Sequence, residues 1–157
     1  MAEIYINSVS STAYNITLAK SSDILYLLRS YLSAGIELNA SVIICVRSIF
    51  DCIVGMFVSN KKVYIARHGG CRVGFMQTNI KSDHTAVMYV YVDPAFRRMG
   101  IGKAFMKKAE CISINNGAAV WLSSKNDNIS AHEFYRHNGF TPVVGKKYTK
   151  FIKASSR

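Results

Sequence analysis

The stretch Ala86–Lys108 constrains the fold most, because a strand, a glycine loop and a helix follow one another within it. The β-branched and aromatic residues of Val87–Val92 are typical of a strand, and Pro94 ends that strand because proline cannot donate to a β-ladder. A basic loop, Arg97–Gly102, follows. Good helix formers with apolar residues at helical spacing then fill Lys103–Glu110. The sequence therefore predicts a loop that leads directly into a helix N-terminus.

The two glycines of this loop, Gly100 and Gly102, indicate a site for an anion. Glycine lets the backbone approach a ligand closely, and the unpaired N–H groups of a first helical turn attract negative charge, so phosphate is the expected ligand. A P-loop would need glycine in place of Arg97 and serine or threonine in place of Ala104. A dinucleotide fingerprint would need a third glycine in place of Phe105. Neither motif fits.

The spacing that fits is Arg97-x-x-Gly100-x-Gly102 after a strand that ends in V-x-P, which resembles the acetyl-CoA loop of the GNAT superfamily of N-acetyltransferases. A second segment, Asn128–Phe140, resembles the N-x-x-A-x-x-[FL]-Y-x-x-x-G-F segment of the same family. The two segments occur in the family's order and at its separation. The resemblance therefore covers roughly residues 63–151.

The resemblance implies an α/β fold in which a mixed, mostly antiparallel sheet contains one splayed parallel pair of strands and has helices on both faces. At 157 residues the chain has the length of one domain, residues 1–157. The strands expected from the residue pattern are Glu3–Asn7, Tyr14–Leu18, Lys62–Arg67, Arg72–Asn79, Thr85–Val92, Ala118–Ser123, Phe140–Val144 and Lys147–Ile152. The expected helices run from Ser22 to Gly35, from Asn39 or Ser41 through Phe50 or beyond, from the glycine loop to about Asn115, and from Asn128 or Ser130 to Asn138.

The resemblance also implies roles for particular residues, with acetyl-CoA as co-substrate and no metal. Tyr135 matches the family tyrosine that protonates the departing thiolate, and Asn128 matches a polar residue that contacts the coenzyme. A phenol suits that role because its ordinary pKa of about 10 keeps it protonated at neutral pH. The positions implied to hold the pantetheine and the pyrophosphate are Val90, Tyr91, Val92, Arg97, Arg98, Met99, Gly100, Ile101, Gly102 and Lys103.

The general base departs from the family pattern. Many members have a glutamate near the positions of Met88 and Tyr89, whereas this chain has no acid between Asp83 and Asp93. We expect a water chain lined by Tyr89 or Tyr91 to carry the proton instead. His84 and His132 are further candidates.

The net charge of +11 arises from nine acidic against twenty basic residues and favours anionic partners. An N-acetyltransferase that acts on a primary amine is the first hypothesis, and a basic RNA-binding or regulatory acyl-CoA-binding module on the same fold is the second. The shortage of acids disfavours polyamines and aminoglycosides as acceptors. It leaves a protein or peptide amine, a small amine or an aminoacyl-tRNA.

Hydropathy and cysteine spacing indicate where in the cell the protein is expected to occur. The apolar run Ser41–Val58 contains charged residues and predicts a buried helix rather than a membrane span, and no secretory signal is recognised at the N-terminus. The cysteines, Cys45, Cys52, Cys71 and Cys111, have no zinc-type spacing and are expected to be reduced core thiols of a cytoplasmic protein. The sequence is compatible with a monomer or a homodimer.

Overall fold

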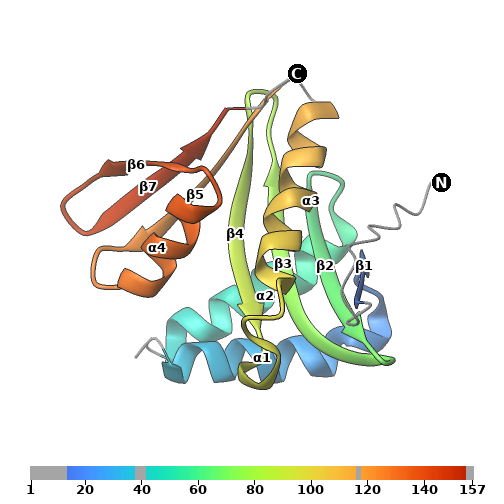
Figure 1. Ribbon diagram of the computed structural model, residues 1–157. Helices are drawn as coiled ribbons and strands as arrows, with labels where there is room; N and C mark the ends of the chain where they lie inside the picture. The colour runs from blue at the N-terminus through green and yellow to red at the C-terminus, as the bar shows by residue number, and fades with distance from the viewer. Residues whose placement is uncertain (1–13, 38–41, 116–117, 155–157) are drawn as a thin grey trace.

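The computed structural model describes residues 14–37, 42–115 and 118–154, which form one seven-stranded mixed sheet with helices on both faces (Figure 1). The strand order is β1-β2-β3-β4-β5-β7-β6, and only the pairing of β4 with β5 is parallel. This architecture confirms the predicted fold class. The predicted strand Glu3–Asn7 lies outside the described residues.

Seven strands follow the predicted order, with bounds that differ by one or two residues. They are β1 (Tyr14–Leu18), β2 (Lys61–His68), β3 (Cys71–Ile80), β4 (His84–Val92), β5 (Ala119–Lys125), β6 (Thr141–Val144) and β7 (Tyr148–Lys153). Buried residues alternate with less buried ones along β5 and through most of β7, because one face of the sheet is covered there and the other is not. The strand predictions are thus confirmed for the described part of the chain.

Four α-helices connect the strands in the described parts of the chain. They are α1 (Ile24–Glu37), preceded by a 3₁₀ turn at Ser21–Asp23, α2 (Val42–Phe57), α3 (Ile101–Asn115) and α4 (Ile129–His137). The predicted stop of α1 at Gly35 is wrong, because Gly35 is buried inside the helix, which continues to Glu37. Packing against neighbouring elements outweighs the weak helix propensity of a single glycine. No helix among the described residues has the length and apolar character needed to cross a membrane.

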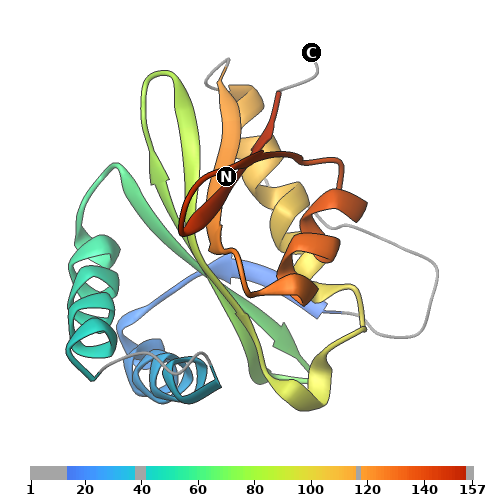
Figure 2. The ribbon, with the colours of Figure 1, turned by 90° about the vertical axis from the view of Figure 1, so that its left-hand side faces the viewer.

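The sheet separates two hydrophobic layers (Figure 2). On one face, α3 and α4 pack on a core that includes Phe105, Met106, Phe140 and Phe151. On the other face, α1 and α2 pack on a second core around Tyr31 and its neighbours on β2, β3 and β4. The end of β4 therefore has α3 and α4 on one side of the sheet and α1 and α2 on the other.

The cysteines do not all lie in these cores, so that prediction is partly wrong. Cys52 is buried on α2, where burial raises the pKa of its thiol to about 11. Cys111 is half-buried and Cys71, at the start of β3, is exposed. Cys71 follows the exposed Gly69-Gly70 turn, so its position at a strand end explains its exposure.

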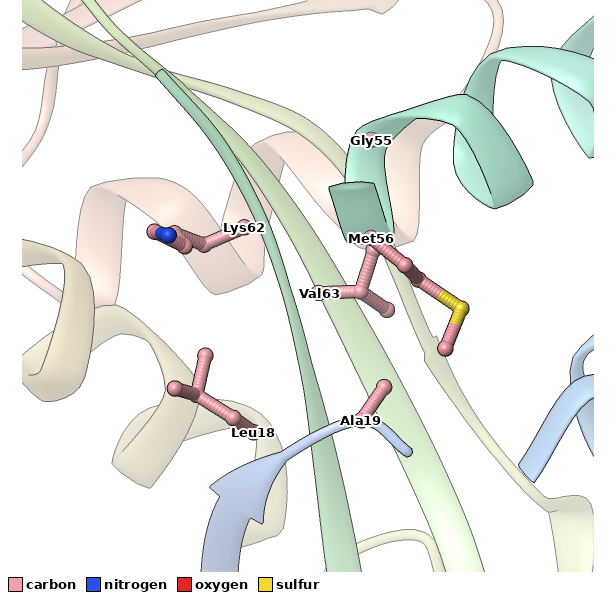
Figure 3. Close-up of a pocket in the computed structure, with 6 residues that line it drawn as sticks. All are labelled: Leu18, Ala19, Gly55, Met56, Lys62 and Val63. Carbon is pink, nitrogen blue, oxygen red and sulfur yellow. The ribbon is translucent and has the colours of Figure 1, made fainter. Parts of the chain in front are cut away.

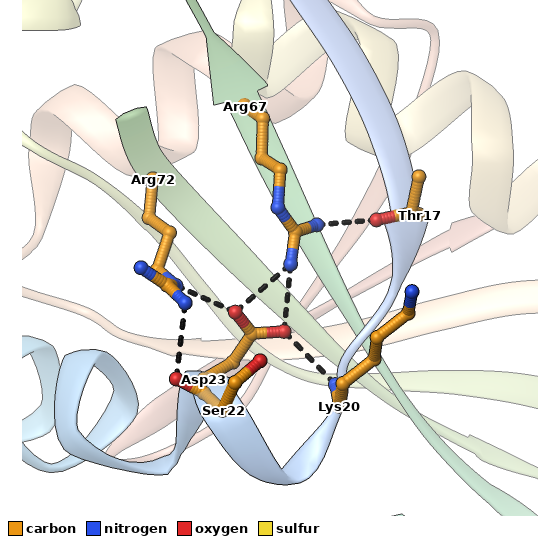
Figure 4. Close-up of polar contacts among 6 residues, drawn as sticks. All are labelled: Thr17, Lys20, Ser22, Asp23, Arg67 and Arg72. Atoms are coloured by element: carbon orange, nitrogen blue, oxygen red, sulfur yellow. Dashed lines mark hydrogen bonds and ion pairs between the residues drawn. The ribbon is translucent and has the colours of Figure 1, made fainter. Parts of the chain in front are cut away.

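A buried ion cluster fixes the start of α1 against the sheet (Figure 4). The Nη2 atom of Arg67 lies 2.8 and 2.7 Å from the two carboxylate oxygens of Asp23, and Nε of Arg72 lies 2.5 Å from one of them. The Lys20 N–H also donates to this carboxylate, and Arg67 donates to the hydroxyl of Thr17. Burial alone would raise the pKa of Asp23, but these donors outweigh it and hold the pKa below its usual value.

Candidate active site

The candidate site begins where β4 and β5 separate. The two strands pair only from His84 to Ala86 on β4 and from Ala119 to Trp121 on β5, although both strands continue beyond these residues. Figure 1 shows them diverging toward the end of β4. The backbone N–H and C=O groups on that side of the later β4 residues therefore form no hydrogen bonds with a neighbouring strand of the described chain.

The register of β3 and β4 identifies which groups point into this gap. The Asp93 N–H donates to the Val73 carbonyl at 2.9 Å, and Val92 and Val90 stand opposite Gly74 and Met76. Because hydrogen-bonded and non-hydrogen-bonded pairs alternate in an antiparallel ladder, the N–H and C=O groups of Val90 and Val92 point away from β3.

The register also contains a bulge before these residues. Gln77 pairs with Tyr89 and Thr78 pairs with Val87, so Met88 is left over as an extra residue in β4. Tyr89 and Tyr91 consequently face α1 and α2, while Val87 and Val90 face α3 and α4. The two faces of β4 beside the gap thus carry different kinds of side chain.

The predicted anion loop lies between β4 and α3. A 3₁₀ turn at Pro94–Phe96 precedes it, and two of its residues, Arg98 and Gly100, have positive φ angles of 66° and 82°. Ala104 donates the first intrahelical bond to Gly100. The N–H groups of Ile101, Gly102 and Lys103 therefore precede the first bond of α3 and are available to a ligand.

The two loop glycines serve different purposes. A side chain at Gly100 would meet only the Tyr14 hydroxyl, at 3.6 Å, so the requirement there is the left-handed backbone. A Cβ at Gly102 would lie 3.1 Å from Cζ of Phe134. The second glycine thus allows α3 to approach α4, a reason that the sequence pattern did not indicate.

Arg97 is already engaged in the structure. Its Nε donates to the Val92 carbonyl at 3.0 Å, and its Nη2 lies 2.8 and 2.7 Å from the two carboxylate oxygens of Glu37. Both side chains are a little under half exposed. Sequence reasoning missed Glu37, which stands sixty residues earlier at the end of α1.

Asn128 and Tyr135 lie on α4 as the second motif predicts. Asn128 is the N-cap, and its side-chain oxygen accepts the Ala131 N–H at 3.3 Å. The Tyr135 ring packs against Phe140 and Phe151, with ring centroids 6.2 and 5.1 Å away. Burial in this aromatic cluster raises the pKa of Tyr135 to about 12, so the phenol stays protonated at neutral pH.

The other face of β4 carries a second polar group. Tyr91 is buried, whereas Tyr89 is 36% exposed, and its hydroxyl lies 2.5 Å from that of Ser48 on α2. The ring of Tyr31 packs edge-on against Tyr89 at 5.2 Å. Ser48 was not a predicted site residue, and the only sequence signal for it is a polar residue within an apolar helix.

The two candidate histidines make other contacts. His132 is buried, its Nε2 lies 2.9 Å from the Lys125 carbonyl, and its ring contacts Phe151. Nδ1 of His84 lies 2.9 Å from a carboxylate oxygen of Asp83, and its ring packs at a tilt against Trp121. Both rings therefore have structural partners, and within the described part of the chain no group of three His, Cys, Asp or Glu side chains is arranged to hold a metal.

A shallow pocket lies elsewhere in the molecule, between β1, β2 and α2 (Figure 3). It has a volume of about 70 Å³, is open to solvent and is lined by Leu18, Ala19, Gly55, Met56, Lys62 and Val63. Lys62 is its only charged residue, and β2 is separated from the β4–β5 gap by β3. The β4–β5 gap, with its unpaired backbone N–H and C=O groups, offers more of the polar groups that acyl transfer needs than this pocket does.

Solved structures of low sequence identity share this fold. The PaiA N-acetyltransferase of Thermoplasma acidophilum, in complex with coenzyme A, is 18% identical over 90% of this chain and 99% of its own, with a TM-score of 0.77. A GNAT-family acetyltransferase of Staphylococcus aureus Mu50 is 22% identical over 89% and 99% of the chains, with a TM-score of 0.72. Ard1 of Thermoplasma volcanium is 22% identical over 89% and 95%, with a TM-score of 0.68.

Sequence comparison identifies the family. No curated protein matches the chain. The family model of the acetyltransferase (GNAT) domain matches residues 59–142, which extend from the start of β2 through the loop and both motif helices into β6. That match spans more than half of the sequence and includes both segments recognised from their residues. The chain therefore belongs to the GNAT family of acetyl-CoA-dependent N-acetyltransferases.

Proposed function

We propose that this chain moves the acetyl group of acetyl-CoA directly to a primary amine within a ternary complex. The observation that carries the proposal is the separation of β4 from β5, which leaves the Val90 N–H and C=O directed into the gap. A fixed N–H there can polarise a thioester carbonyl, and the strand backbone can pair with the amides of pantetheine. Tyr91 and Val92 complete this segment of β4.

The loop before α3 is proposed to hold the pyrophosphate. Its contribution is the N–H groups of the first helical turn, together with the charge of the exposed side chains Arg97, Arg98 and Lys103. Met99 is half-buried and Ile101 is buried, so their side chains anchor the loop, while the Ile101 N–H remains available to the ligand. The Asn128 amide retains an NH₂ group for the coenzyme while its oxygen caps α4.

Tyr135 is proposed as the general acid. As the amine nitrogen attacks the thioester carbon, the C–S bond breaks and the sulfur takes the phenol proton, which solvent later replaces. Tyr135 and Val90 both pack at the border of the same core cluster, on the α3 and α4 face. The raised pKa of Tyr135 keeps the proton on the phenol until the thiolate forms.

The proton of the attacking amine is proposed to leave through water. β4 offers no carboxylate next to the gap, and of its two candidate tyrosines only Tyr89 reaches solvent. The hydrogen bond with Ser48 fixes the Tyr89 hydroxyl, which can then orient a water molecule beside the amine. Tyr89 is thus a positioning residue, and Ser48 supports it.

The experiment compares Tyr135→Phe with the unchanged chain. We expect the release of free thiol in the presence of a panel of peptide and small amines to fall about 10²–10⁴-fold, the usual contribution of general acid catalysis. Coenzyme A affinity, measured by calorimetry, should stay within about twofold. Equal turnover by the two proteins would refute the role of Tyr135.

A further inference from the structure

The second half of the sheet presents one face that none of the described helices covers. Val120 and Leu122 on β5 and Phe151 on β7 belong to the α3 core, so their strand neighbours point to the opposite side. We call these opposite residues the open sheet face. They are Trp121, Ser123 and Lys125 on β5 and Tyr148, Lys150 and Ile152 on β7.

The open sheet face is accessible. Ser123, Lys125 and Lys150 are exposed, and Tyr148 is 53% exposed. The helices of that side, α1 and α2, pack on β2 and β3 instead. Figure 2 shows them beside the other half of the sheet, with β5, β6 and β7 extending beyond them.

This face is continuous with the β4–β5 gap. Trp121 pairs with Ala86 at the last position where the two strands meet, and Ser123 and Lys125 follow it along the diverging part of β5. Tyr89 lies across the gap on β4, on the same side of the sheet. A molecule lying on the open sheet face would therefore present one end to the gap.

The charge of this region is mainly positive. The strands β5, β6 and β7 contain no aspartate or glutamate, while Lys125 and Lys150 project from the open sheet face and exposed Lys146 and Lys147 lie in the adjoining turn. Two acids lie near its border: Asp83, which contacts His84 and interacts electrostatically with Lys150, and exposed Asp127, two residues after Lys125. The four lysines outnumber them. The face therefore favours a ligand that carries negative charge.

One of the two aromatic rings on this face, that of Trp121, is already contacted by other side chains. The Nζ atom of Lys150 lies 4.4 Å from the centroid of the Trp121 ring, and the His84 ring lies 4.8 Å from it. Stacking of a base would require displacement of both. Carboxylates need only the lysine ammonium groups, whose long side chains can turn toward them.

We propose that the open sheet face binds an acidic peptide, with its amino terminus directed into the β4–β5 gap as the acetyl acceptor. The binding surface follows from the charge and exposure of Lys125 and Lys150, and the use of the amino terminus rests on the proposed function. Carboxylates in the first residues of the peptide would pair with the two lysines, and apolar side chains would contact Tyr148 and Ile152. In this proposal the positive charge of the two lysines selects acidic peptides as acceptors, and no separate pocket for a side chain is required.

Trp121 provides a direct readout, because it is the only tryptophan of the chain and Lys150 covers it. Three short peptides with free amino termini would be titrated at low ionic strength, identical except for aspartate, serine or lysine at their second and third residues. We expect the aspartate peptide to change Trp121 emission saturably and to bind at least about tenfold more tightly than the serine peptide, which is 1.4 kcal/mol. The lysine peptide should give no saturable change.

Charge reversal tests the assignment of the lysines. In the double variant Lys125→Glu/Lys150→Glu the order of the peptides should invert, measured by anisotropy of labelled peptides because the substitution also alters the Trp121 environment. The matched control is Lys20→Glu/Lys62→Glu, which changes the same charge at the β1–β2 edge of the sheet. It should keep the preference for aspartate.

Several outcomes would overturn the proposal. Equal affinity for the three peptides, an unchanged order in the double variant, or tighter binding of a short single-stranded RNA that displaces the aspartate peptide would each do so. The stabilisation by acetyl-CoA is measured separately on the same protein. If the aspartate peptide binds most tightly but acetyl-CoA does not stabilise the protein, the proposed function is refuted and the peptide-binding surface is supported. If acetyl-CoA stabilises the protein but the peptides bind equally, only the peptide-binding surface is refuted.

Discussion

Arg97 and Glu37 form an ion pair in which one guanidinium nitrogen lies 2.8 and 2.7 Å from the two carboxylate oxygens. The pair joins the end of α1 to the loop proposed to bind pyrophosphate. A phosphate that approaches Arg97 must therefore share it with a carboxylate. This arrangement predicts that Glu37 lowers coenzyme affinity while it orders the loop.

Replacing Glu37 with glutamine should tighten coenzyme A binding about two- to fivefold, because an exposed pair of this kind is worth about 0.2–1 kcal/mol. Calorimetry at low salt would measure the change. The gain should shrink at high salt, where exposed charges are screened. Glu133→Gln on the exposed side of α4 is the control, and weaker binding by the Glu37→Gln variant would show that the carboxylate is needed to orient Arg97.

Gly102→Ala should destabilise the fold by about 1–3 kcal/mol, the usual cost of overpacking a tight contact. An added Cβ would lie 3.1 Å from Phe134, whereas alanine in an ordinary helix position is favoured over glycine. Urea denaturation would measure the loss. The double variant Gly102→Ala/Phe134→Leu should recover part of it, and a Gly102→Ala variant as stable as the unchanged chain would contradict the packing account.

Asp23→Asn should lower the free energy of unfolding at pH 7 by about 2–4 kcal/mol, because Arg67 and Arg72 lose a buried carboxylate. The folded pKa of Asp23 lies below its unfolded value, so its contribution is complete above about pH 4. That contribution disappears as the pH falls through the folded pKa. Denaturation of both proteins across acid pH should therefore show curves that converge, and a constant difference would contradict this.

The raised pKa of Tyr135 predicts the alkaline limb of the pH profile. An ordinary phenol, with a pKa of about 10, would lose its catalytic proton on the way to pH 10. With a pKa of about 12, Tyr135 keeps the proton, so kcat at saturating amine should stay flat between pH 8 and pH 10. A decline with a midpoint below pH 10 would mean that another acid acts or that the burial of Tyr135 is lost in the complex.

The sequence predicted the loop and the helix that carry the proposed coenzyme residues, since both are local segments. The loop from Arg97 to Gly102 and the helix that carries Asn128 and Tyr135 are each specified by contiguous residues, through strand breakers, glycines and helix formers. Their residue pattern was therefore sufficient to find them. The splayed strand pair was implied only by the family resemblance.

The contacts that the sequence could not predict join distant segments. Glu37 reaches Arg97 across sixty residues, Ser48 reaches Tyr89 across 41, and Asp23 reaches Arg72 across 49. A periodic pattern reports which side of a helix is apolar but not which polar residue meets another element. Apolar character alone does not decide burial either, since Leu32 on α1 is 50% exposed while its neighbour Tyr31 is buried.

Thermal unfolding with and without saturating acetyl-CoA tests the central claim most directly. A ligand that binds only the folded state at about 100 times its dissociation constant adds about 2.7 kcal/mol of stability. We expect the unchanged chain to melt at a clearly higher temperature with acetyl-CoA. Gly100→Glu, which places bulk and negative charge in the loop, should abolish that shift. A folded, unchanged chain whose melting temperature does not respond to acetyl-CoA would contradict the account.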